Sequence, residues 1–316
     1  MPVFDAATHA ALVAALQDEY LADDLAPPDT SLNWSEARLR AWFESGGAEA
    51  EPPAAVPPAS RPSTSLKEGE HLVEIPYADG KVLQGKLTWP GGEFAEVGLL
   101  WCPGNPAANP HFDYWGETMD SPLISTMASS VASGEHTSNA KYAFLRFDYT
   151  TTLPNRTNRG GYSDLAYPPY GAEEAVAAME FLRAMCRKVA VGGHNVGASH
   201  AVEAALSIGD GLLALVSINH APDVHKFIPA AMQKMANGKS VQAEMERGVR
   251  SLPAGVPKLY LAASGDPVSP PASLQRYVDW TPKPAEMAIL ENTLFTLKGR
   301  EAEIARTVLR FVHSAN

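Results

Sequence analysis

From residue 66 to the C-terminus, short continuous apolar runs alternate with segments of helical periodicity, and this alternation restricts the fold more than any other feature. The runs are VGLLWC, KYAFLRF, KVAVGG, LLALVSI, PKLYLAA and AEMAILE. Helices are expected between them, near residues 121–133, 171–186, 197–208, 222–248, 271–279 and 300–313. Because continuous apolar strands are typical of sheets buried on both faces, the pattern predicts an α/β protein with a mostly parallel central sheet covered by helices on both sides.

Two further strand runs, EHLVEIPY and KVLQGKLTWP, precede this alternation and flank the turn residues Ala78, Asp79 and Gly80. Strand runs separated by a short turn of this composition are typical of a hairpin. We therefore expect an antiparallel pair of strands at the N-terminal end of the sheet.

The first sixty residues differ in charge from the rest of the chain. They contain ten acidic side chains against Arg38 and Arg40, a net charge of −8, whereas the whole chain carries −11. Amphipathic helices are expected at 6–22 and 34–45, and the prolines of residues 46–65 predict a semi-rigid spacer. The expected organisation is an acidic helical arm (1–45), a linker (46–65) and an α/β domain (66–316). The arm either docks a protein partner or folds back on its own domain.

Composition excludes several classes of function. Cys102 and Cys186 match no metal-ligand spacing and predict free thiols in a reducing compartment, so neither a metal nor another cofactor is expected. The chain shows no run of 18 apolar residues and no secretory leader, which predicts a soluble cytoplasmic protein without a membrane partner. Its acidic balance argues against a nucleic-acid partner.

The segment Gly193-His194-Asn195-Val196-Gly197 joins an expected strand to an expected helix. Small residues at its first and last positions let a sharp turn pack tightly between the two elements. The segment resembles the nucleophile elbow of the α/β-hydrolase superfamily, in particular the small serine hydrolases without a large lid. The stretch from Asp266 to Pro270 resembles the loop of the family acid, and residues 146–164 resemble an arginine-containing loop of these relatives. The resemblance covers about residues 66–316.

The resemblance implies a role for each of five positions, and two of them have lost it. Asn195 stands at the nucleophile position, where a carboxamide has no group that can attack as an anion. Asp266 stands at the acid position. Leu294 stands at the histidine position, which implies that the base is lost. Val196 and Gly104 would supply the backbone N–H groups of the oxyanion hole, with Asn105 as an alternative to Gly104.

Five side chains near the expected strand ends are pocket candidates, and each also has a structural interpretation. A thiol at the end of a strand is reactive or simply a small apolar side chain. A histidine is a ligand, a base or a hydrogen-bonded structural residue. An amide or an imidazole in a proline-rich loop lines a pocket or packs locally. The candidates are Cys102, Asn105, His111, His194 and His220.

The loss of two catalytic positions leads to a pseudoenzyme hypothesis. The domain would serve as a scaffold, an interaction module or a ligand-binding subunit that takes a small molecule. The alternative is an active esterase or peptidase, seen as an altered variant or using an unusual base such as His220. An imidazole facing an ionisable nucleophile in the cleft would favour that alternative.

Overall fold

The computed structural model describes residues 66–77, 81–104, 117–135, 141–150, 171–209, 211–220 and 238–316. All of them belong to a compact unit that begins at Pro58. The acidic arm (1–45), the linker (46–65), the turn at 78–80, the candidates Asn105 and His111, and residues 151–170 of the arginine-containing loop lie outside the described residues. The expectations for these segments stay predictions.

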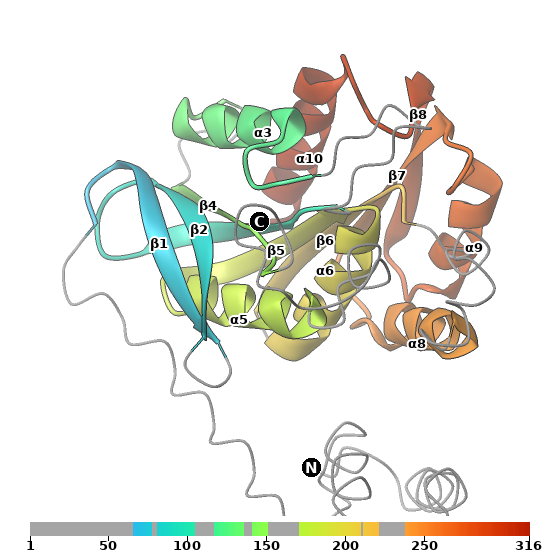
Figure 1. Ribbon diagram of the computed structural model, residues 1–316, viewed down its shortest axis with the longest axis horizontal. Helices are drawn as coiled ribbons and strands as arrows, with labels where there is room; N and C mark the ends of the chain where they lie inside the picture. The colour runs from blue at the N-terminus through green and yellow to red at the C-terminus, as the bar shows by residue number, and fades with distance from the viewer. Residues whose placement is uncertain are drawn as a thin grey trace, which may run out of the picture. The chain divides into compact units, whose positions relative to one another are not determined.

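The described strands form one sheet in the order β1-β2-β4-β3-β5-β6-β7-β8 (Figure 1). Strand β1 pairs antiparallel with β2, and β2 pairs antiparallel with β4, whereas β3 to β8 are all parallel to one another. The expected hairpin is confirmed, since Tyr77 at the end of β1 pairs with Lys81 at the start of β2. The strands are β1 Gly69–Tyr77, β2 Lys81–Trp89, β3 Ala95–Cys102, β4 Tyr142–Phe147, β5 Cys186–His194, β6 Leu212–Ile218, β7 Lys258–Gly265 and β8 Ala285–Leu294.

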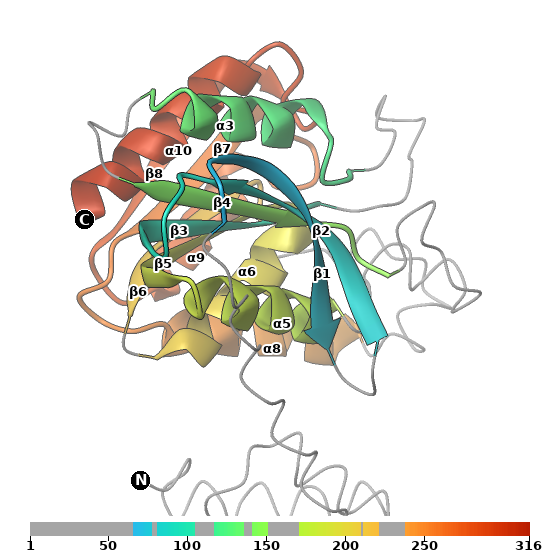
Figure 2. The same ribbon diagram turned by 90° about the vertical axis from the view of Figure 1, so that its left-hand side faces the viewer.

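Helices cover both faces of this sheet, as Figures 1 and 2 show. On one face α3 (Pro122–Ala132) and α10 (Glu301–Ala315) pack against each other. On the other lie α5 (Gly171–Arg183), α6 (Val196–Ile208), α8 (Gly238–Ser251) and α9 (Pro271–Trp280). The helix expected at 222–248 is described only from Gly238, and it continues to Ser251. The predicted α/β class and layering are confirmed.

The central strands explain why the apolar runs were continuous. Every residue of β4 and β6 is buried, because each face of the sheet packs into its own apolar core beneath helices. The same expectation was wrong for the last run. In β8 only Leu290 and Thr293 are buried, because β8 is the last strand of the sheet and has a neighbour on one side only.

Of the helices that the structure describes, none combines the length and the apolar composition needed to cross a membrane.

Candidate functional site

The turn between β5 and α6 keeps the geometry of an elbow. Asn195 has φ 54° and ψ −119°, a backbone conformation that side-chain-bearing residues rarely adopt. A Cβ atom at Gly197 would overlap the carbonyl oxygens of Cys102 and Pro103, and one at Gly193 would overlap the backbone of Gly197. Both glycines are therefore required for the close approach of α6 to the ends of β3 and β5, as the sequence predicted.

The side chain of Asn195 is turned back onto its own helix. Its Oδ1 accepts a hydrogen bond from the backbone N–H of Val196 at 2.7 Å. The backbone N–H of Asn195 donates to the carbonyl of Ile218 at 2.9 Å, which fixes the turn against the end of β6. Because the Val196 N–H already has an acceptor, it does not point freely at a ligand.

The second predicted N–H, that of Gly104 after β3, is also occupied. It donates to Oε2 of the Glu117 carboxylate. Oε1 of the same carboxylate lies 3.2 Å from Nδ1 of His194, the residue before the elbow. Glu117 and His194 are both buried, with 5% and 1% of their surfaces exposed. Both positions assigned to an oxyanion hole thus donate to side chains of this chain.

His194 is electrostatically favoured as an imidazolium. Burial alone lowers its pKa, but the charge and hydrogen bond of Glu117, the charge of Asp266 and the backbone of Phe295 outweigh burial and raise the pKa above its ordinary value. A protonated ring donates from Nδ1 to the Glu117 carboxylate, which makes this a charge-assisted hydrogen bond. The sequence placed His194 beside the elbow and left open whether it only packs there; the structure makes it the partner of Glu117.

Asp266, at the acid position, holds its own loop. Its Oδ1 accepts from the backbone N–H groups of Val268 at 2.7 Å and Ser269 at 3.0 Å. Its Oδ2 is buried and has no hydrogen-bond partner among the described residues. Burial raises the pKa of Asp266, while the bonds from Ser269 and Val268 and the charge of His194 counter that rise. The positive charge of His194, when the ring is protonated, is thus one of the influences that lower the pKa of Asp266.

Leu294, at the histidine position, is the last residue of β8 and pairs with Gly265. Its side chain is 67% exposed. The next residue, Phe295, turns inward, and its ring centroid lies 5.8 Å from that of His194. Asn219 holds this turn, because its Nδ2 donates to the Phe295 carbonyl at 3.4 Å. Among the described residues, no imidazole is hydrogen-bonded to the side chain of Asn195.

An imidazole does face a serine one helical turn beyond the elbow. His220 Nε2 lies 3.0 Å from Oγ of Ser199, and both side chains are buried, with 1% and 4% exposed. Burial, assisted by the charge of His200, lowers the pKa of His220 to about 3. Its Nδ1 has no hydrogen-bond partner in the described part of the chain, so no carboxylate orients the ring. The ring instead lies 4.3 Å from that of Tyr277 in α9.

The pair of Ser199 and His220 therefore has the first contact of a nucleophile and its base, but no described residue supplies the third group. Ser199, four residues after Asn195, is not part of any motif that would have identified it from the sequence. Contact between them depends on how α6 meets the end of β6, which a local pattern does not record.

Cys102 is fully buried, and burial raises the pKa of its thiol far above the ordinary range. A buried neutral thiol is a poor nucleophile, so the apolar interpretation of this candidate fits its surroundings. Among the described residues, no group of three or more histidine, cysteine, aspartate or glutamate side chains is arranged to hold a metal ion.

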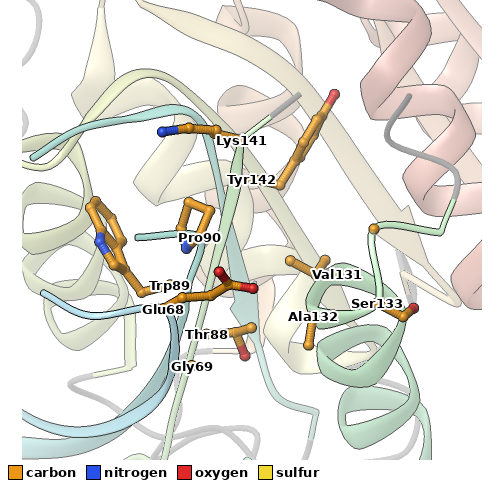
Figure 3. A pocket seen from close by; sticks show the side chains of 11 residues that line it. Glu68, Gly69, Thr88, Trp89, Pro90, Val131, Ala132, Ser133, Lys141 and Tyr142 are labelled. Atoms are coloured by element: carbon orange, nitrogen blue, oxygen red, sulfur yellow. The ribbon is translucent and has the colours of Figure 1, made fainter. Parts of the chain in front are cut away.

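A cavity of about 310 Å³ opens away from the elbow, between the C-terminal end of α3 and the beginning of the sheet. Figure 3 shows Val131 and Ala132 of α3 on one side, with Glu68, Thr88 and Trp89 on the other. The lining residues include no pairing of a nucleophile with a base. This cavity does not belong to the site around Asn195.

Solved structures with a similar fold include several hydrolases and esterases. Dienelactone hydrolase from Anabaena variabilis is 17% identical with a TM-score of 0.56, and the match covers 78% of this chain and 97% of that one. Est1E from Butyrivibrio proteoclasticus is 14% identical with a TM-score of 0.54, over 76% and 96% of the two chains. A serine hydrolase without a lid from Xanthomonas campestris is 13% identical with a TM-score of 0.53, over 79% and 95%. No family model and no curated protein matches the chain. The chain has the α/β-hydrolase fold.

Proposed function

We propose that this α/β-hydrolase-fold protein does not catalyse hydrolysis and acts as a scaffold, interaction or ligand-binding subunit. The observation that carries the proposal is the state of the two N–H groups expected to stabilise an oxyanion. Val196 donates to Asn195, and Gly104 donates to Glu117. Acyl transfer requires such donors to be aimed at the developing negative charge of the substrate. Here each donor already has an oxygen of the chain as its acceptor.

The residues beside these donors support the same interpretation. A carboxamide at position 195 offers neither a proton to lose nor an anion to attack carbon. The base position is occupied by the exposed side chain of Leu294. Asp266, the remaining acid, interacts electrostatically with His194, whose ring is already hydrogen-bonded to Glu117. Within the described part of the chain, the nucleophile and base of the resemblance are thus replaced and the oxyanion donors engaged.

The pair of Ser199 and His220 favours a second candidate function, an active esterase or peptidase with a displaced nucleophile. The 3.0 Å contact between them is the supporting observation. The pKa of His220, which burial lowers to about 3, argues against this candidate, because general bases are most effective when their pKa lies near the working pH. The burial of Ser199 also leaves its hydroxyl without access to a substrate.

Steady-state turnover of small carboxylic esters, thioesters and peptides by four proteins separates the two candidates. They are the unaltered chain, Asn195→Ser, Ser199→Ala and the double variant. The proposal predicts no saturable turnover by any of them, because a new serine at 195 would still lack a base. Turnover by the unaltered chain that disappears in Ser199→Ala would establish the second candidate. Turnover gained only in Asn195→Ser would show that a base and oxyanion donors are still available, which would contradict the argument about those groups, while turnover by the unaltered chain would contradict the proposal itself.

A further inference from the structure

We propose that the Gly104 N–H and the His194 imidazole form a binding site for a carboxylate group, which in this structure is filled by the chain's own Glu117. The group recognised is a carboxylate: that of Glu117 in the unaltered chain, and a small monocarboxylate of matching size when the Glu117 side chain is removed. This inference goes beyond the proposed function, since it concerns the surroundings of Glu117 and holds whether or not the protein has turnover.

The geometry is that of a built site. One carboxylate oxygen, Oε2, accepts from the backbone of Gly104, and the other, Oε1, lies 3.2 Å from Nδ1 of His194. The imidazole is 99% buried and the donor backbone lies in a buried segment. Two donors that converge on the two oxygens of one carboxylate are the arrangement that recognises this group in a water-poor environment.

The space between Gly104 and His194 also matches a carboxylate in size. A Cβ atom at Gly104 would lie 2.6 Å from Oε2 of Glu117 and 3.2 Å from Nδ1 of His194. Only a glycine at position 104 leaves room for a carboxylate between its own N–H and the imidazole. The site is therefore specific in size as well as in charge.

Glu117 reaches the site from a segment that is held independently. The backbone N–H of Met119 donates to Asp148 at 2.7 Å, and the carboxylate of Asp120 binds Lys86 at 2.7 Å. These contacts connect the segment to β2 and to the end of β4 without involving Glu117. Removing the Glu117 side chain should therefore empty the site while the surrounding backbone stays anchored.

Chemical rescue of Glu117→Ala tests the proposal. The variant lacks the Cγ and carboxyl groups of Glu117, and acetate supplies the same atoms, while formate supplies the carboxyl alone. Sodium acetate and sodium formate should raise the Tm of Glu117→Ala in a saturable manner, whereas sodium chloride at equal ionic strength should not. Propionate, which has one carbon more than the space vacated, should act more weakly.

Two matched proteins control for general effects of the salts. The unaltered chain should show no saturable response, because Glu117 fills the site. Glu117→Gln should also fail to respond, because its amide oxygen still accepts from Gly104 and its volume blocks entry. A response of equal size in these proteins, or no difference between acetate and chloride in Glu117→Ala, would overturn the proposal.

A second readout reports on His194 directly. In Glu117→Ala the NMR-detected pKa of His194 should fall, because the largest favourable charge beside the ring is gone, and saturating acetate should raise it again. An unchanged titration on adding acetate would contradict binding at this ring. If Glu117→Ala is recovered unfolded, refolding yield is compared in acetate and in chloride, and equal yields would likewise reject the site.

Discussion

Asn195 is a structural residue in a position shaped for a reactive one. Its backbone adopts a positive φ of 54°, and its Oδ1 accepts the N–H of Val196. Asparagine tolerates positive φ better than most residues, and its amide is a good acceptor for a free N–H at the start of a helix. The residue that removes nucleophilic chemistry from the elbow therefore also stabilises the elbow.

Substitution of Asn195 should show this stabilising role. Asn195→Ala loses the cap and places alanine at a positive φ, so we expect the free energy of unfolding to fall by about 1–2 kcal/mol. Asn195→Gly also loses the cap but adopts the conformation freely, and it should cost only a few tenths of a kcal/mol. Urea unfolding of the three proteins measures the difference. Equal losses in both variants would show that backbone conformation is not a factor here.

His220 predicts a dependence of stability on pH. Its ordinary pKa is 6.5 and burial lowers it to about 3, so the unfolded chain binds a proton below pH 6.5 that the folded chain refuses. This residue thus makes folding less favourable as pH falls from about 6.5 toward 3. His200, whose pKa burial also lowers to about 3, acts in the same direction.

Comparison of variants isolates the contribution of His220. His220→Asn should lose less stability than the unaltered chain between pH 7 and pH 5, because one of the two described imidazoles whose pKa burial lowers is gone. Ser199→Ala is the matched control, since it removes the hydroxyl partner and keeps the imidazole, and its loss between the two pH values should resemble that of the unaltered chain. Urea unfolding of the three proteins at both pH values gives one difference in stability for each. An equal loss in His220→Asn would show that this ring does not titrate as described.

At the scale of elements, the contact between α6 and β3 determines the site. Gly197 in the first turn of α6 lies against the carbonyl oxygens of Cys102 and Pro103, which belong to backbone that cannot move independently. This contact brings Gly104 and the elbow together and so places Glu117 beside His194. The spacing of the two elbow glycines is thus a requirement of helix packing, whatever chemistry the elbow carries.

A methyl group at Gly197 tests this contact. We expect Gly197→Ala to lower the free energy of unfolding by about 1–3 kcal/mol, as overpacking does in well-packed interiors. Gly248→Ala is the control, because it also lies in a helix, but its nearest neighbour is the Val202 side chain at 3.2 Å, which can yield. The control should be neutral or stabilising, since alanine favours helix by about 1 kcal/mol over glycine. Comparable losses in both would mean that general crowding explains the effect.

For the whole molecule, the sequence predicted more of the fold than of the site. Strands such as β4 and β6 are buried on both faces, so their continuous apolar composition was enough to predict a mostly parallel sheet. The elbow followed from the spacing of Gly193 and Gly197. The exposure of β8 was not predicted, because a similar apolar composition does not reveal that the strand lies at the edge of the sheet.

The network around the elbow could not be predicted in the same way. Glu117 and His194 are 77 residues apart, and no motif surrounds Glu117. Ser199 and His220 meet only because α6 packs over the end of β6. Such contacts are set by the tertiary arrangement, whereas the prediction that nucleophile and base are lost rests on the identity of two single residues, Asn195 and Leu294.

The acidic arm is the segment that we expect to dock a protein partner under the proposed scaffold role. Since the described residues lie in a unit that begins at Pro58, deletion of residues 1–60 should leave the domain folded with an unchanged cooperative thermal transition. Under the proposal the truncated protein should lose the partners that the full chain binds. Circular dichroism and comparative affinity capture check the two parts. An unchanged set of partners would remove the arm from the docking role.

The absence of a reactive nucleophile can be measured directly by intact mass spectrometry after incubation with a fluorophosphonate. Our account predicts that the folded protein keeps its unmodified mass, because Asn195 has no attacking oxygen, and Ser199 is buried beside a poor base. Stoichiometric addition of one phosphonyl group to the folded chain, at any serine, would contradict it.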